Sequence, residues 1–149
     1  MKHNLRKLST KDIKLFTLNN LTVLARIPAD EVYDGDTCKA VFYYQKKPVK
    51  YTIRMTGYDS PEMKPRLNNP NRDQEKKAAI KAKEALIKLV ASKPDQIVVL
   101  QCGKWDKYGR SLGTIYLNQH DQQINRSVNQ IMIDRHFGIP YNGGKKKIS

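Results

Sequence analysis

Hydrophobic residues first gather at positions 21–33, and this run ends at Asp34-Gly35, a dipeptide typical of tight turns between strands. Two further runs, residues 37–44 and 49–58, are separated by a short polar segment. In the second of these, apolar and polar side chains alternate, which predicts a strand with one buried face. On that pattern Arg54 points away from the core. The first third of the chain therefore predicts three consecutive strands.

A helix is predicted over residues 72–91, with Asn71 as its N-cap. Charged side chains follow one face of this helix, and small or aliphatic side chains follow the other. The apolar face consists of Ala79, Ala82, Leu86, Leu89 and Val90. Such a face can pack on a sheet or lie on an anionic membrane. Its alanines, and its lack of Trp and Phe, favour packing on a sheet.

Two more strands are predicted over residues 97–102 and 112–117, joined by a polar loop that contains residues 106–110. Apolar residues between positions 124 and 132 predict a second, shorter helix that Gly138 would end. This order of elements is typical of an α+β fold. We expect a five-stranded OB-fold β-barrel, with one helix between strands three and four and a second short helix after strand five.

The length of 149 residues suits a single domain with its own core. We expect an N-terminal extension over residues 1–20, this domain over residues 21–138, and a basic C-terminal tail over residues 139–149. Two cysteines, Cys38 and Cys102, are too few for a disulfide framework or a cysteine zinc site. We interpret both as buried free thiols.

Basic residues outnumber acidic ones by 28 to 14, which gives a formal net charge of +14. Such a charge attracts polyanions, and it does not by itself separate nucleic acid from an anionic membrane surface. No apolar run reaches the about 18 residues of a membrane span, and no secretory signal is recognisable. We therefore expect no membrane partner, and an intracellular or virus-associated location rather than a secreted one.

Acidic residues are scarce, and four of them come in two pairs. Asp34 and Asp36 flank a glycine, and Asp59 and Glu62 flank Ser60-Pro61. The first pair can be a simple turn. The second has the form of a helix capping box, although another proline three residues after Glu62 would interrupt that helix.

An EF-hand loop beginning at Asp34 is excluded, because Cys38 and Ala40 stand at the remaining liganding positions, and no glycine or terminal glutamate stands at the required places. Two separate carboxylate segments can instead converge on one hard cation, and oxygen ligands of this kind suit Ca²⁺ or Mg²⁺. The residues alone thus leave a turn, a capping box and a divalent cation site open.

Three segments together resemble the staphylococcal nuclease (thermonuclease) family: residues 33–37 (YDGDT), 54–62 (RMTGYDSPE) and 106–110 (DKYGR). The element order agrees as well, so the resemblance covers roughly residues 21–138. It implies a metal-dependent nuclease that hydrolyses phosphodiester bonds of DNA and RNA, with Ca²⁺ as cofactor and little sequence specificity. We expect this enzyme to be a monomer.

The resemblance also implies roles for the acidic segments. Asp36 and Asp59 match the carboxylate ligands of the cation, and Ser60 matches the position that contributes its backbone carbonyl. Asp34 matches a nearby acidic residue that supports the metal site. Glu62 matches the general base that activates the attacking water.

Arg54 and Arg110 match the two arginines that bind the phosphate. Two guanidinium groups beside a cation would supply positive charge where negative charge grows on the phosphoryl oxygens, whatever the family. Lys107 and Tyr108 match residues of the nucleotide pocket. Tyr141 corresponds to a base-stacking tyrosine, the alternative being an exposed aromatic residue of the tail.

Two features depart from the best-known family members. The hairpin between Asp36 and Arg54 is longer, and a short tail follows Gly138 in place of a long third helix. We expect residues 5–18 to cover what that helix buries. A catalytically inactive nucleic-acid or protein binding module on the same barrel is the alternative function, although such modules generally lack the carboxylates and arginines present here.

Overall fold

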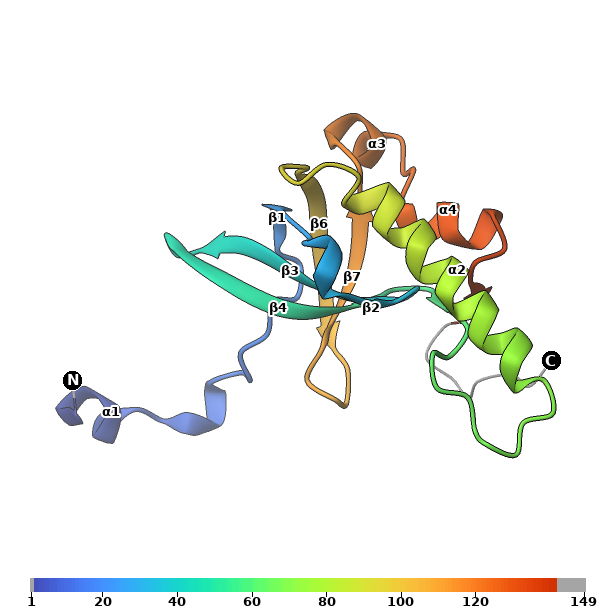
Figure 1. Ribbon diagram of the computed structural model, residues 1–149. Helices are drawn as coiled ribbons and strands as arrows, with labels where there is room; N and C mark the ends of the chain where they lie inside the picture. Colours follow the sequence, from blue (N-terminus) through green and yellow to red (C-terminus); the bar gives the residue numbers. More distant parts are fainter. Residues whose placement is uncertain (1, 142–149) are drawn as a thin grey trace.

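The computed structural model describes residues 2–141 (Figure 1). Strands form the centre of the molecule, and the long helix α2 lies along one side of them. The strands are β1 (Thr22–Ala25), β2 (Val32–Asp34), β3 (Thr37–Tyr44), β4 (Lys47–Met55), β5 (Tyr58–Asp59), β6 (Val98–Trp105), β7 (Ser111–Tyr116) and β8 (Ile139–Pro140). The helices are α1 (Lys2–Lys7), α2 (Arg72–Val90), α3 (Gln119–Gln123) and α4 (Val128–Asp134), with 3₁₀ turns η1 (Thr10–Asp12) and η2 (Ala29–Glu31).

Six strands form one sheet in the order β1-β6-β7-β4-β3-β2, in which β4 and β7 pair in parallel and the other neighbours are antiparallel. Strands β5 and β8 form a separate antiparallel pair. The predicted α+β class is confirmed. The prediction of five strands was wrong, and the sheet does not close through a full ladder. Instead, a single isolated bridge joins Arg26 to Val41 of β3.

The extra strands arise where the predicted runs break. The run over residues 21–33 divides into β1 and β2, because the chain turns through η2 just after Pro28. Proline has no amide hydrogen to donate to a sheet ladder, so it disfavours a continuous central strand at this point. The run over residues 49–58 likewise divides at Gly57, whose φ of +91° is left-handed and suits glycine.

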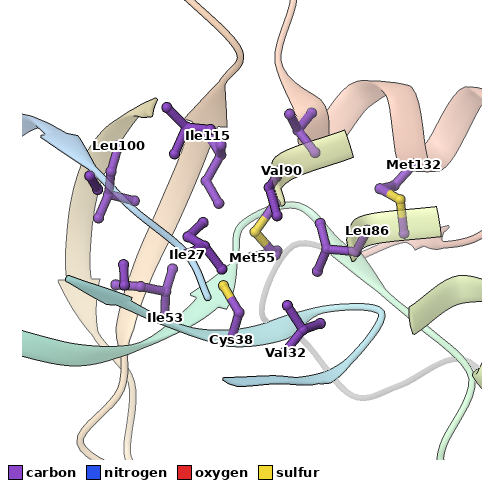
Figure 2. Packing of buried hydrophobic residues seen from close by; sticks show 14 of the residues in the cluster. Ile27, Val32, Cys38, Ile53, Met55, Leu86, Val90, Leu100, Ile115 and Met132 are labelled. Carbon is purple, nitrogen blue, oxygen red and sulfur yellow. The ribbon is translucent and has the colours of Figure 1, made fainter. Parts of the chain in front are cut away.

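Helix α2 packs on the strands, as its apolar face predicts. Its residues Ala79, Ala82, Leu86 and Val90 are fully buried, so this face is not available to a membrane. Leu86 and Val90 lie beside Met55 of β4 and Met132 of α4 in the core (Figure 2). The small side chain of Ala82 lets the backbone of Gly35 approach closely: a Cβ at Gly35 would lie 2.7 Å from the Ala82 Cβ.

The predicted second helix consists of two short helices, α3 and α4. Helix α4 ends at Asp134 and not at Gly138, since the chain passes through His136 at a φ of +63°. The glycine at position 138 is explained by close packing and not by the end of a helix. A Cβ there would lie 2.3 Å from Cδ2 of the Tyr58 ring, so only glycine fits against that ring.

The N-terminal extension does not cover the domain as expected. Among the extension's side chains from position 4 onward, only Leu18 is buried, whereas the other aliphatic ones are more than half exposed: Leu5, Leu8, Ile13 and Leu15. Phe16 makes edge contacts with Tyr44 and Trp105. Helix α1 projects away from the sheet (Figure 1).

Cys38 and Cys102 are free and buried, as predicted. The beginning of the predicted tail is part of the fold, since Ile139–Pro140 forms β8. Residues 142–149 of that tail lie outside the described residues.

Candidate active site

One pocket, with a volume of about 1310 Å³, is lined by residues of four separate segments: the β2–β3 turn, the end of β4 with the chain that follows it, the β6–β7 loop with the start of β7, and Tyr141 after β8. All ten predicted site residues line this pocket: Asp34, Asp36, Arg54, Asp59, Ser60, Glu62, Lys107, Tyr108, Arg110 and Tyr141. The fold therefore brings together residues that are more than 100 positions apart in the chain.

The carboxylate of Asp36 is buried and held from both sides. Thr37 Oγ1 donates a hydrogen bond of 2.8 Å to its Oδ1, and the Ser60 amide donates one of 2.9 Å to its Oδ2. The Asp36 amide in turn donates to Asp34 Oδ1 at 3.0 Å, which closes the turn. The dipeptide Asp34-Gly35 is thus a real turn, and it also places two carboxyl groups in the pocket.

These two carboxyl groups titrate differently. Burial, followed by the negative charge of Asp36, raises the pKa of Asp34 to about 7. Burial also raises the pKa of Asp36, but the Arg54 charge and several hydrogen bonds outweigh it, so this pKa is lowered overall. The pocket therefore keeps Asp36 ionised and makes a second negative charge at Asp34 unfavourable.

Arg54 is the cation that faces these carboxylates. Its guanidinium lies 3.3 Å from Asp36 Oδ2 and donates a hydrogen bond to Asp59 Oδ1. It also donates to the backbone carbonyl oxygens of Met55 and Tyr58, at 3.1 and 2.9 Å. One guanidinium therefore spans the carboxylates of both predicted metal ligands.

The second arginine is fixed by its own loop. Asp106 accepts hydrogen bonds from the amides of Tyr108 and Arg110 through Oδ1, and from Arg110 Nε through Oδ2 at 2.6 Å. Gly109 has a φ of +80°, which suits glycine in this tight loop. The cationic groups of Lys107 and Arg110 lie 5.1 and 5.2 Å from the centre of the Tyr108 ring.

Asp106 is a site residue to which the sequence pattern assigned no role. Burial raises its pKa, but the amide hydrogen bonds of Arg110 and Tyr108 and the Arg110 side chain outweigh this effect and lower the pKa overall. The sequence signal that could have identified this role was the position of Asp106, four residues before Arg110 and inside the third matching segment. Asp106 orients Arg110 rather than contacting the carboxylates.

Glu62 and Tyr141 also line the pocket. Glu62 is exposed, and no helix begins at Ser60-Pro61, so the capping-box interpretation was wrong. Tyr141 is half-buried, and its amide donates a hydrogen bond of 2.9 Å to the Gly57 carbonyl. Tyr141 is therefore tied to the pocket and is not a loose tail residue.

The family model of staphylococcal nuclease homologues matches residues 52–140, which include the end of β4, all elements from β5 to β8 and most of the pocket. The chain belongs to the staphylococcal nuclease homologue family. No curated protein matches the chain significantly. As a staphylococcal nuclease homologue, the chain belongs to a nuclease-type family. Asp34 and Asp36 precede the matched stretch, so it is the tertiary structure that places them beside Asp59.

Members of the staphylococcal nuclease homologue family generally depend on Ca²⁺, so we tested whether the residues fit this ion. Within residues 2–141, no three His, Cys, Asp or Glu side chains are grouped closely enough to hold a metal by themselves. Two carboxylates, Asp36 and Asp59, do share one guanidinium, and hard oxygen donors of this kind suit Ca²⁺. The donor chemistry fits the ion, with backbone oxygens and water needed to complete its shell.

The described helices include none that is long and apolar enough to cross a bilayer.

Proposed function

We propose that the protein is a metal-dependent nuclease that hydrolyses phosphodiester bonds of DNA and RNA with little sequence specificity. The observation that carries this proposal is the convergence of the two carboxylates Asp36 and Asp59, the exposed Glu62 and the oriented Arg110 on one open pocket. The catalytic unit is the domain of residues 21–138, and it acts as a monomer.

Residues Asp36, Asp59 and the backbone carbonyl of Ser60 would hold Ca²⁺, with Asp34 in support. When bound, the ion supplies a Lewis acid that polarises the phosphoryl group. Burial of Asp36, and its bonds from Thr37 and Ser60, fix one ligand in advance. Burial and the charge of Asp36 raise the pKa of Asp34, so a divalent cation bound beside the pair would favour its ionised form.

The two arginines act differently in this proposal. Asp106 holds Arg110 at Nε, which leaves the outer nitrogens of its guanidinium to bind phosphate oxygens. Arg54 is already bound to Asp36 and Asp59, so it would exchange at least one of these contacts for a phosphate oxygen. Both then stabilise the charge that develops during attack.

Glu62 is the general base that takes a proton from the attacking water. Glu62 is exposed and lines the pocket, which gives it access to solvent water and to a bound strand. Lys107 would bind a phosphate, and Tyr108 and Tyr141 would stack on bases or sugars. Because these contacts do not depend on base identity, low sequence specificity and cleavage of both DNA and RNA follow.

The direct test measures hydrolysis of single-stranded DNA and RNA with Ca²⁺, with Mg²⁺ and with chelator. We expect cleavage with Ca²⁺ that the chelator abolishes. We expect Glu62→Gln to lose about 10²-fold to 10⁴-fold in turnover, and Arg110→Ala about 10²-fold to 10³-fold. Glu84→Gln and Arg135→Ala make the same charge changes at exposed positions of α2 and after α4, and they should cleave normally.

Chelator-resistant cleavage would contradict the metal-dependent mechanism. Binding of strands with no cleavage under any metal would instead favour an inactive binding module. Normal turnover by either site variant would remove the role assigned to that residue.

A further inference from the structure

The long β3–β4 hairpin has an outer face that the active site does not use. The ladder pairs Lys39 with Thr52 and Tyr43 with Pro48. Since side chains alternate along a strand, Lys39 and Tyr43 point to the face opposite the buried one, which consists of Cys38, Ala40 and Phe42. Lys39 is exposed, and Tyr43 is 74% exposed, so its ring is available to a ligand.

This outer face is continuous with the active-site pocket. At the other end of the same ladder Thr37 pairs with Arg54, and both line the pocket. From Thr37 to Tyr43 the strand extends for roughly 20 Å, at about 3.3 Å per residue. The hairpin projects from the rest of the sheet as an arm (Figure 1).

The outer face is predominantly basic. The bridge between Arg26, the residue after β1, and Val41 places Arg26 in one row with Val41 of β3 and its partner Lys50 of β4. Arg26, Lys39 and Lys50 are exposed. One acidic group opposes them: Glu31 Oε1 accepts a 2.9 Å hydrogen bond from Lys50 Nζ and neutralises that lysine.

We propose that this surface binds the single strand of nucleic acid that continues out of the active-site pocket. We name it the hairpin face and define it by Arg26, Lys39, Tyr43, Lys50 and the exposed Lys46 at the hairpin tip. Its basic groups contact successive phosphates, and Tyr43 stacks on a base. The occupant is a polynucleotide because the face combines positive charge with an exposed aromatic ring and leads into the pocket. The proposal rests on the proposed function for that pocket.

The first experiment measures binding without catalysis, by fluorescence anisotropy in chelator with a labelled strand longer than about 16 nucleotides. We expect Tyr43→Ala to weaken binding about tenfold, and Tyr43→Phe to retain it, because the phenyl ring still stacks. Lys39→Ala should reduce the dependence of log K on log salt by about 0.7. Lys77→Ala removes the same charge from the exposed face of α2 and is the matched control.

Glu31→Gln is a variant that should strengthen strand binding, whereas Tyr43→Ala should weaken it. It removes the one negative charge known to pair with a lysine of this face and releases Lys50, so we expect severalfold tighter binding. A structural defect would weaken binding instead. Equal losses in Lys39→Ala and Lys77→Ala would show that only the general positive field acts, and would overturn the proposal.

The second experiment compares cleavage of the long strand with cleavage of a dinucleotide, which is too short to reach Tyr43. We expect Tyr43→Ala and Lys39→Ala to lower kcat/KM on the long strand and to leave the dinucleotide unchanged. Equal losses on both substrates would contradict the proposal. If the parent protein cleaves neither substrate, the proposed function fails, and the binding comparison still decides whether the hairpin face takes a strand.

Discussion

The hydroxyl of Tyr58 donates a 2.7 Å hydrogen bond to the backbone carbonyl of Gly35, and both groups are buried. Gly35 lies between Asp34 and Asp36, so this bond ties strand β5 to the turn that presents two carboxyl groups. The same ring packs against Gly138, beside β8. Tyr58 therefore links the two acidic segments to the end of the domain, although it does not line the pocket.

Tyr58→Phe removes this bond and leaves the buried Gly35 carbonyl without its hydrogen-bond donor. We expect the free energy of unfolding to fall by about 1–3 kcal/mol, the usual cost of an unsatisfied buried polar group. Chemical denaturation measures this change, and calcium titration calorimetry should show weaker binding by the displaced turn. Tyr43→Phe, at an exposed position, is the matched control. An unchanged unfolding free energy would show that the bond is not important for stability.

Gly138→Ala places a methyl group 2.3 Å from Cδ2 of the Tyr58 ring. Because that ring is fully buried, it has little room to move, and we expect a loss of about 1–3 kcal/mol from overpacking. Gly103→Ala is the control, since its Cβ would make an ordinary 3.4 Å contact with Leu112. Thermal unfolding of both variants checks the prediction. If they unfold at the same temperature, the close approach is relieved by a backbone shift.

Asp106→Asn weakens the anchor of Arg110, because the neutral amide presents one acceptor oxygen where the carboxylate uses two. We expect lower kcat with little change in overall structure. The effect on stability depends on pH. The folded pKa of Asp106 is below its ordinary 3.8, so the carboxylate stabilises the fold above that pH and loses this contribution as pH falls through the folded pKa.

The stability difference between the parent protein and Asp106→Asn should therefore be constant near neutral pH and shrink under acid conditions. Urea unfolding at several pH values measures it. If the difference grows as pH falls, the pKa of Asp106 is not lowered in the folded protein.

Phe16→Ala removes the one aromatic side chain that the N-terminal extension packs on the domain. Phe16 contacts Tyr44 and Trp105, with ring centres 5.9 and 6.3 Å away, and Trp105 stacks on Tyr51. Phe16 is half exposed, so we expect a modest loss of about 1 kcal/mol in unfolding free energy. Leu15→Ala, at a residue 83% exposed, should change it by less than about 0.5 kcal/mol. Equal effects would show that the extension contributes no specific packing.

Local patterns predicted the elements that depend on neighbouring residues. Alternation along residues 49–55 predicted β4 and the outward direction of Arg54, and helical spacing predicted α2 almost to its last residue. The site residues were predicted together through resemblance, because three short segments match those of one known family in the same order. The prediction of a closed barrel was wrong. Closure depends on how strands far apart in the sequence meet, and here the chain after β1 meets β3 through the isolated bridge between Arg26 and Val41 and not through a ladder.

The resemblance to a known family indicated that three segments belong to one site. The sequence by itself determined which residues carry charge and which faces are apolar. Those properties lie within a few neighbouring positions, where side-chain spacing controls strand and helix formation. Only the tertiary structure decided that Asp106 anchors Arg110 and that Gly138 accommodates the Tyr58 ring. It alone also placed Arg54 between Asp36 and Asp59. These relationships depend on distances between atoms that meet only when the chain is packed, because hydrogen bonds and steric contacts act over a few ångströms in space and not along the sequence.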